Sequence, residues 1–162
     1  KTPAAVDALS HMIAARTVER LYLALAHGPW RHTPVADVDQ PMARDARNRL
    51  RMAVVRGEGA GKPAQTRFAA LDQTPRHVLL ACKLHTGRTH QIRVHLASEG
   101  MPILGDDKYG DFALNKQMAR AQHFARMFLH ARALSFDHPV SGERITLVAP
   151  LPADCEKLLP IQ

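Results

Sequence analysis

Short apolar runs, each about the length of a β-strand, constrain the fold of this chain more than any other feature. The clearest covers residues 21–26 and ends at Gly28 and Pro29. A run this short, closed by residues that break regular structure, is typical of a buried strand. The sequence predicts strands over residues 18–26, 64–71, 77–84, 127–136 and 144–148, and a weaker strand over 48–56. Residues 137–142 would form the turn of a hairpin between the strands at 127–136 and 144–148.

Apolar residues at helical spacing occur in a few other segments. They predict helices over residues 3–16, 90–99, 113–124 and 153–159, the second with Thr89 as N-cap and Gly100 as its stop. Residues 28–48 carry prolines and no persistent period, so we expect them to be irregular. Because helices and strands do not alternate regularly, the expected fold is α+β. It would be a single domain over residues 1–162, with a mixed, mostly antiparallel sheet flanked by helices.

The charge of the chain favours an anionic partner. Its 162 residues carry 22 Lys and Arg against 15 Asp and Glu, a formal net charge of +7, and 16 of the basic residues are Arg. The guanidinium is a planar fork of donors that fits phosphate groups and base edges, and nucleic-acid-binding proteins use such an excess. Composition alone leaves a second interpretation open, in which the arginines are solvated surface charges.

Several classes of protein are disfavoured. The sequence has no apolar run long enough to span a membrane and no apolar segment near its start of the kind that a signal peptide carries. Cys82 and Cys155 are too few for a disulfide scaffold, so we expect a reducing, cytoplasmic setting. His85, His90 and His95 stand five residues apart, which puts neighbours on different faces of a helix or a strand, so no metal site is expected.

The densest polar segment, residues 85–95, follows a predicted strand and opens a predicted helix. Gly87 is expected to provide a sharp turn, and the helix N-terminus would offer free backbone N–H groups. Arg88, Gln91 and Arg93 beside that end favour a site for an anion or a base edge. The alternative is a polar turn with surface arginines.

A second polar segment, residues 105–111, combines three aspartates with two glycines. The ligand spacing of a calcium loop is absent. We therefore expect Asp106 and Asp107 to act as turn and capping residues rather than as cation ligands.

Both polar segments resemble the signature of the RluA family of pseudouridine synthases. The matching motifs are TGRTHQIRVHL at 86–96, PILGD at 102–106, KYGD at 108–111, LYLAL at 21–25 and FLHA at 128–131. The doubled aspartate followed by Tyr-Gly-Asp is most similar to the RluC branch, which modifies 23S ribosomal RNA in bacteria. The resemblance implies an enzyme that isomerises uridine to pseudouridine in large-subunit ribosomal RNA, in the cytoplasm, without a metal or any other cofactor.

The resemblance also implies roles for individual residues. Tyr22 would place its ring against the target uracil, as an aromatic ring can do with a flipped base. Arg93 would pair with the catalytic Asp and keep its carboxylate ionised. Tyr22, Arg93 and Leu129 would then converge on one cleft. The other substrate-binding residues would face the RNA or build the pocket: Arg88, Thr89, His90 and Gln91.

One departure from the family's pattern outweighs the others. The nucleophile of the family is the Asp of a His-Arg-Leu-Asp motif, and no Arg-Leu-Asp occurs in this sequence. We therefore expect the C-terminal part of a catalytic domain, without the upstream segment that carries the Asp and without an S4 RNA-binding domain. Arg93 would then lack a carboxylate partner, and the isolated chain would be inactive. The alternative is a non-catalytic RNA-binding module derived from the same fold.

Overall fold

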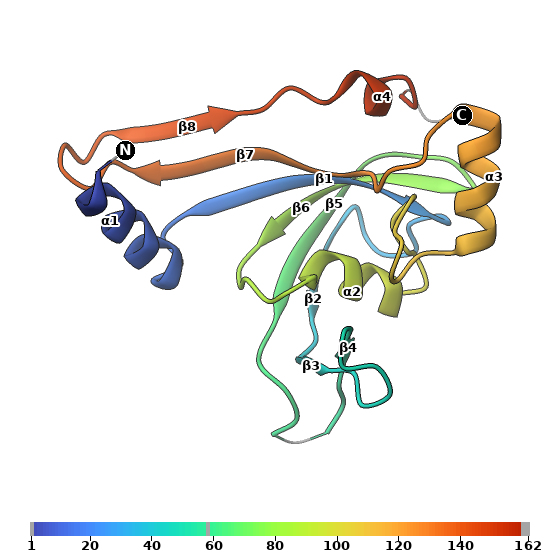
Figure 1. The fold of residues 1–162 in the computed structure, drawn as a ribbon, viewed down its shortest axis with the longest axis horizontal. Helices are drawn as coiled ribbons and strands as arrows, with labels where there is room; N and C mark the ends of the chain where they lie inside the picture. The colour runs from blue at the N-terminus through green and yellow to red at the C-terminus, as the bar shows by residue number, and fades with distance from the viewer. Residues whose placement is uncertain (1, 58, 160–162) are drawn as a thin grey trace.

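The computed structural model of the protein, which describes residues 2–57 and 59–159, is built on a six-stranded sheet (Figure 1). Its strands lie in the order β2-β5-β6-β1-β7-β8, and a separate two-stranded sheet joins β3 and β4. All neighbouring strands described pair antiparallel, so the predicted α+β class and mostly antiparallel sheet are confirmed. The strands are β1 (Glu19–His27), β2 (Val35–Asp39), β3 (Met42–Arg44), β4 (Met52–Val54), β5 (Gln65–Gln73), β6 (His77–Leu84), β7 (Leu129–Asp137) and β8 (Arg144–Val148).

The strands predicted from the five apolar runs are all present as β1, β5, β6, β7 and β8 of the large sheet. The prediction that residues 28–48 are irregular is wrong, because β2 and β3 lie within them. Pro34 and Pro41 stand just outside β2 and so bound this strand rather than interrupt it. The weaker strand expected over 48–56 is reduced to β4, since the residues before it form the turn that joins β3 to β4.

The helices lie outside the sheet, with α1 and α3 at opposite ends of the molecule (Figure 1). They are α1 (Pro3–Ala14), α2 (Gln91–Ser98), α3 (Phe112–Gln122) and α4 (Ala153–Glu156). The N-cap of α2 is His90, so the prediction of Thr89 as N-cap is wrong. The closing helix is shorter than the predicted range of 153–159. No helix in the described part of the chain is long and apolar enough to cross a membrane.

The two faces of the sheet pack against different elements. On one face, side chains of β1 and β6 form a buried cluster with Ile92 of α2. On the other face, Leu25 and Leu79 pack with Phe128 in a second cluster. Successive residues of a strand alternate between faces, so Tyr22 lies on the side of α2, where it packs against the first cluster. The fold thus places the loop that precedes α2 and the ring of Tyr22 on one side of the sheet.

Candidate functional site

The loop between β6 and α2, residues 85–90, begins beside the first residues of β1. The register of the two strands pairs Leu21 with Lys83, so Arg20 lies where β6 leads into the loop. The φ of Gly87 is not positive, so the backbone at this position does not require a glycine for a sharp turn. A Cβ on Gly87 would lie 2.8 Å from Nη1 of Arg20, which is the far end of a flexible side chain.

Gln91 anchors this loop from inside the protein. Its Oε1 accepts hydrogen bonds from Oγ1 of Thr86 at 2.7 Å and from the backbone N of Arg88 at 3.0 Å. Its Nε2 donates to the backbone O of Gln65 and to Oγ1 of Thr66, both at 2.9 Å. Both N–H donors and both acceptor sites of the buried amide are therefore used. Gln91 is buried and has no polar atom left to face RNA.

Arg93 has a carboxylate partner, so the prediction that it lacks one is wrong. Its Nε and Nη2 donate to the two carboxylate oxygens of Asp106 at 2.8 and 2.7 Å, and Nη2 also donates to Asp107 at 3.0 Å. Burial acts to raise the pKa of Asp106, but hydrogen bonds from Arg93 and from the backbone of Tyr109 and Lys108 outweigh it, and the net pKa is lowered. The Nε–Nη2 edge of Arg93 is thereby occupied within the chain.

The aspartates of this loop have the roles expected of turn residues. The carboxylate of Asp106 accepts the backbone N–H groups of Lys108 and Tyr109, both at 2.8 Å. The side chain of Asp106 is fully buried, whereas that of Asp107 is 87% exposed. Asp111 caps α3 by accepting from the backbone N of Ala113 and Leu114, both at 3.0 Å.

Tyr109 connects this loop to the hairpin of β3 and β4. Its hydroxyl accepts a hydrogen bond from the backbone N of Met52 at 2.9 Å and lies 3.0 Å from Nδ1 of His90. The guanidinium carbons of Arg51 and Arg93 lie 4.9 and 5.1 Å from the centre of its ring, within the range of a cation–π contact. Burial, and then the charge of Arg93, lower the pKa of His90. His90 thus belongs to an internal network around the phenol.

Tyr22 lines an open pocket of about 310 Å³. The pocket is bordered by Arg20 and Arg132 and by apolar residues of β7 and β8. Tyr22 is half-buried, so part of its ring is accessible to a ligand. Leu129 pairs with Ala24, two residues further along β1, and packs against the same cluster as Tyr22.

The convergence of Tyr22, Arg93 and Leu129 on one cleft stays a prediction. Tyr22 and Leu129 share a face of the sheet. Neither Leu129 nor Arg93 is among the described residues that line the Tyr22 pocket. The guanidinium of Arg93 donates to Asp106.

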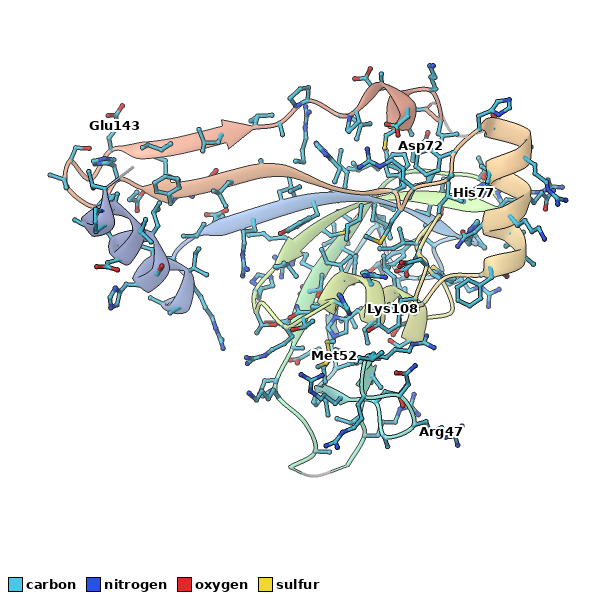
Figure 2. The ribbon with its side chains drawn as sticks, viewed as in Figure 1. Arg47, Met52, Asp72, His77, Lys108 and Glu143 are labelled. Carbon is cyan, nitrogen blue, oxygen red and sulfur yellow. The ribbon has the colours of Figure 1, made fainter. Side chains whose placement is uncertain are left out.

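A second hollow of about 550 Å³ borders two of the other predicted substrate residues. It is lined by Arg88 and Thr89 and by two further basic residues, Arg44 and Lys62, with no acidic side chain among its described lining residues. Nε of Arg88 donates to a backbone carbonyl at 3.0 Å, which holds the side chain at the rim. The hairpin of β3 and β4 supplies one wall and extends away from the sheet, with Arg47 near its end (Figure 2). This hollow is suited to a polyanion.

The buried histidine of α2 has a structural role. His95 is fully buried, and its Nε2 lies 3.0 Å from the backbone O of Gln40. That carbonyl can only accept, so Nε2 carries the proton and Nδ1 accepts from Oγ1 of Thr66 at 2.9 Å.

Within residues 2–57 and 59–159, no group of three or more His, Cys, Asp or Glu could hold a metal ion.

Sequence reasoning missed two residues of this region. Arg20 precedes Tyr22 by two positions, and the period of a strand would have put both on one face. Tyr109 stands inside the quoted KYGD motif, where it received no role. Its contacts with Met52 and His90 join segments far apart in sequence, and no local signal gives them.

Comparisons of the sequence and of the fold with known proteins point to one and the same class of protein. Residues 1–98 match the model of the RNA pseudouridylate synthase family. Ribosomal large subunit pseudouridine synthase D of Xanthomonas campestris is 41% identical over 165 residues, which cover 98% of this chain and 48% of the relative. Ribosomal large subunit pseudouridine synthase C of Pasteurella multocida is 38% identical over 162 residues, with 98% and 48% covered. The structure of human RNA pseudouridylate synthase domain containing 1 has a TM-score of 0.76 at 27% identity, covering 93% of this chain and 62% of that one.

The fold is therefore that of a pseudouridylate synthase domain. The chain belongs to the RNA pseudouridylate synthase family, as its motifs predicted. It spans about half the length of the curated relatives it matches.

Proposed function

We propose that this chain is part of the catalytic domain of an RNA pseudouridine synthase that acts on large-subunit ribosomal RNA. The observation that carries the proposal is the Tyr22 pocket, in which an accessible aromatic ring is bordered by two arginines. The ring offers a stacking surface to a base turned out of RNA, and the arginines attract the phosphate backbone. Relatives named for the ribosomal large subunit support the choice of RNA, and their bacterial sources support a bacterial, cytoplasmic setting.

The reaction requires a carboxylate that this chain does not offer at the Tyr22 pocket. Isomerisation breaks the N1–C1′ bond of uridine and joins C1′ to C5, while C5 loses its proton and N1 takes one up. The described lining of the pocket contains no Asp or Glu, and Asp106 is engaged by Arg93. In the proposal, the nucleophilic Asp belongs to a segment outside these 162 residues, and this chain is the C-terminal portion of the catalytic domain.

The residues of this chain would then bind and orient the substrate. Tyr22 holds the uracil, and Leu129 supports the same face of the sheet. Arg88 and Thr89 contact the RNA backbone from the basic hollow. Gln91 and Arg93 act indirectly, because they fix the loop before α2 and the loop after it.

Release of tritium from large-subunit ribosomal RNA labelled at C5 of uridine tests the proposal. A longer protein that adds a His-Arg-Leu-Asp segment to this chain should release tritium, and Tyr22→Leu should slow that release by at least about 100-fold, because the base loses its position. The isolated 162-residue chain should bind the RNA and release none.

Two other results would contradict the proposal in different ways. Turnover by the isolated chain would show that one of its own aspartates is the nucleophile. A longer protein that binds the RNA without releasing tritium would favour a non-catalytic RNA-binding module.

A further inference from the structure

Arg20 is a basic side chain of the Tyr22 pocket whose charge is not matched by an ion pair with any described residue. Its Nε is buried and makes no hydrogen bond to any described residue. The carboxylate beside it in sequence, that of Glu19, points to the opposite face of the sheet because strand residues alternate. There Glu19 pairs with Lys83 at 3.0 Å and with Arg144 at 2.9 Å. No ion pair among the described residues includes Arg20.

The guanidinium of Arg20 bridges the Tyr22 pocket and the loop of Arg88. Arg20 and Tyr22 lie on one face of β1 and line the same pocket. A Cβ on Gly87 would lie 2.8 Å from Nη1 and 3.1 Å from Nη2 of Arg20, so the guanidinium occupies the space that a side chain at position 87 would fill. The end of Arg20 therefore lies directly against the backbone of the TGR motif.

The pocket concentrates positive charge beside an aromatic ring. Arg132 also lines it and donates from Nη1 to the backbone O of Ala149 at 2.8 Å. The buried Nε of Arg20 has no acceptor among the described residues, which is unfavourable. A ligand that presents two oxygens to its donor fork would relieve this, and phosphate groups have that geometry.

We propose that Arg20 binds a phosphate group of the nucleotide whose base lies against Tyr22. Two residues along a strand are about 6.6 Å apart, so a single nucleotide can reach both side chains. The identity of the base rests on the proposed function, whereas the phosphate site rests on Arg20 and Gly87.

Binding of uridine and its monophosphates to the 162-residue chain tests this inference. Nuclear magnetic resonance titrations at low salt would compare uridine, uridine 5′-monophosphate and uridine 3′-monophosphate. At least one monophosphate should bind about tenfold more tightly than uridine, as expected for one charge-assisted contact. Arg20→Gln should remove this advantage and leave the affinity for uridine unchanged. Arg20→Lys should keep part of it, because Lys retains the charge without the fork.

Two further variants separate a specific contact from a general loss of charge. Gly87→Ala keeps every charge and crowds the end of the flexible Arg20 side chain, so it should reduce the monophosphate advantage by less than Arg20→Gln does. Arg120→Gln, at an exposed position of α3 outside the pocket, removes one charge and should leave the advantage intact. Circular dichroism would check that each variant is folded.

The outcomes distinguish this inference from the proposed function. An absent advantage in the wild-type chain, or one that survives both Arg20→Gln and Gly87→Ala, would overturn the phosphate site. If Tyr22→Leu then still weakens the binding of uridine, the proposed function stands without it. Binding of inorganic phosphate that depends on Arg20, with no binding of uridine, would support the phosphate site and remove the role of Tyr22.

Discussion

Arg93 holds both carboxylate oxygens of Asp106, a residue 13 positions further along the chain. The same carboxylate accepts two backbone N–H groups of its own loop. Hydrogen bonding to Asp106 raises the pKa of Arg93, although burial acts in the opposite direction. One buried pair therefore fixes the position of a whole loop relative to α2.

Asp106→Asn should lower the free energy of unfolding by about 3 kcal/mol, because the largely buried charge of Arg93 then keeps only the exposed carboxylate of Asp107 as a partner. Urea denaturation of the 162-residue chain would measure the change. Asp107→Asn is the matched control, since Asp107 contacts the same guanidinium but is 87% exposed. It should change the free energy by no more than about 1 kcal/mol. Equal losses in the two variants would contradict the assigned role of Asp106.

The contribution of Asp106 should also depend on pH. Its folded-state pKa lies below the ordinary value of 3.8, so the ionised form stabilises the fold above that value. The contribution is lost as the pH falls through the folded-state pKa. The stability difference between the wild-type chain and Asp106→Asn should therefore shrink below about pH 4. Urea titrations from pH 6 to pH 3 would detect this, and a constant difference would exclude it.

His95 should remain neutral at a pH where a free histidine is protonated. Burial lowers its pKa from the ordinary value of 6.5, although the hydrogen bond to the Gln40 carbonyl opposes this. Since the folded-state pKa is depressed, the associated stability is present above pH 6.5 and lost as the pH falls. The ring nitrogen shifts of His95 in a magnetic resonance titration would report its charge. A midpoint at or above 6.5 would contradict the structure.

Gln91→Leu should lower the free energy of unfolding by about 2–3 kcal/mol. The apolar side chain has a similar size but removes Oε1 of Gln91, the acceptor for the buried hydroxyl of Thr86 and for the backbone N of Arg88. Gln117→Leu, at an exposed position of α3, is the control and should stay within about 0.5 kcal/mol of the wild type. Thermal and urea denaturation would compare the two, and a loss confined to Gln117→Leu would refute the anchoring role.

The turn between β3 and β4 should contribute phosphate contacts to RNA binding. Arg47 and Arg49 are exposed there, and Asp45 holds the turn by accepting the backbone N–H groups of Arg47 and Asn48. Each contact to a single strand contributes about 0.7 to the slope of log affinity against log salt. The double variant Arg47→Gln, Arg49→Gln should reduce that slope by about 1.4. Filter binding to ribosomal RNA between low and moderate salt would measure it, and an unchanged slope would place the RNA elsewhere.

Much of the sheet could be predicted from the sequence because its central strands are buried on both sides. Strands such as β1 and β6 appear as continuous apolar runs, which local periodicity detects. Strand β2 escaped detection because it is an edge strand with two aspartates, and Val35 is 53% exposed. Backbone pairing with β5 holds these residues in a strand, although their own sequence does not predict one.

The site was located by its motifs, but the contacts within it were not. The family pattern drew attention to residues 85–95 and to Tyr22. The family pattern pairs Arg93 with an Asp that this sequence lacks. In the structure its partner is Asp106, which comes within reach because the chain reverses after α2. Pairings between side chains on separate elements follow from tertiary packing, and a single sequence contains no measure of those distances.

The hairpin of β3 and β4 has only three residue pairs, and a two-stranded ribbon of this kind is marginally stable in water by itself. Its attachment to the rest of the protein includes one phenolic oxygen, which Tyr109 presents to the backbone of Met52, and the buried side chain of Met42. The hairpin is therefore stabilised in part by its contact with the loop that Asp106 holds in place. A defect at Asp106 would therefore weaken, through Tyr109, one of the contacts that hold the hairpin carrying Arg47 (Figure 2).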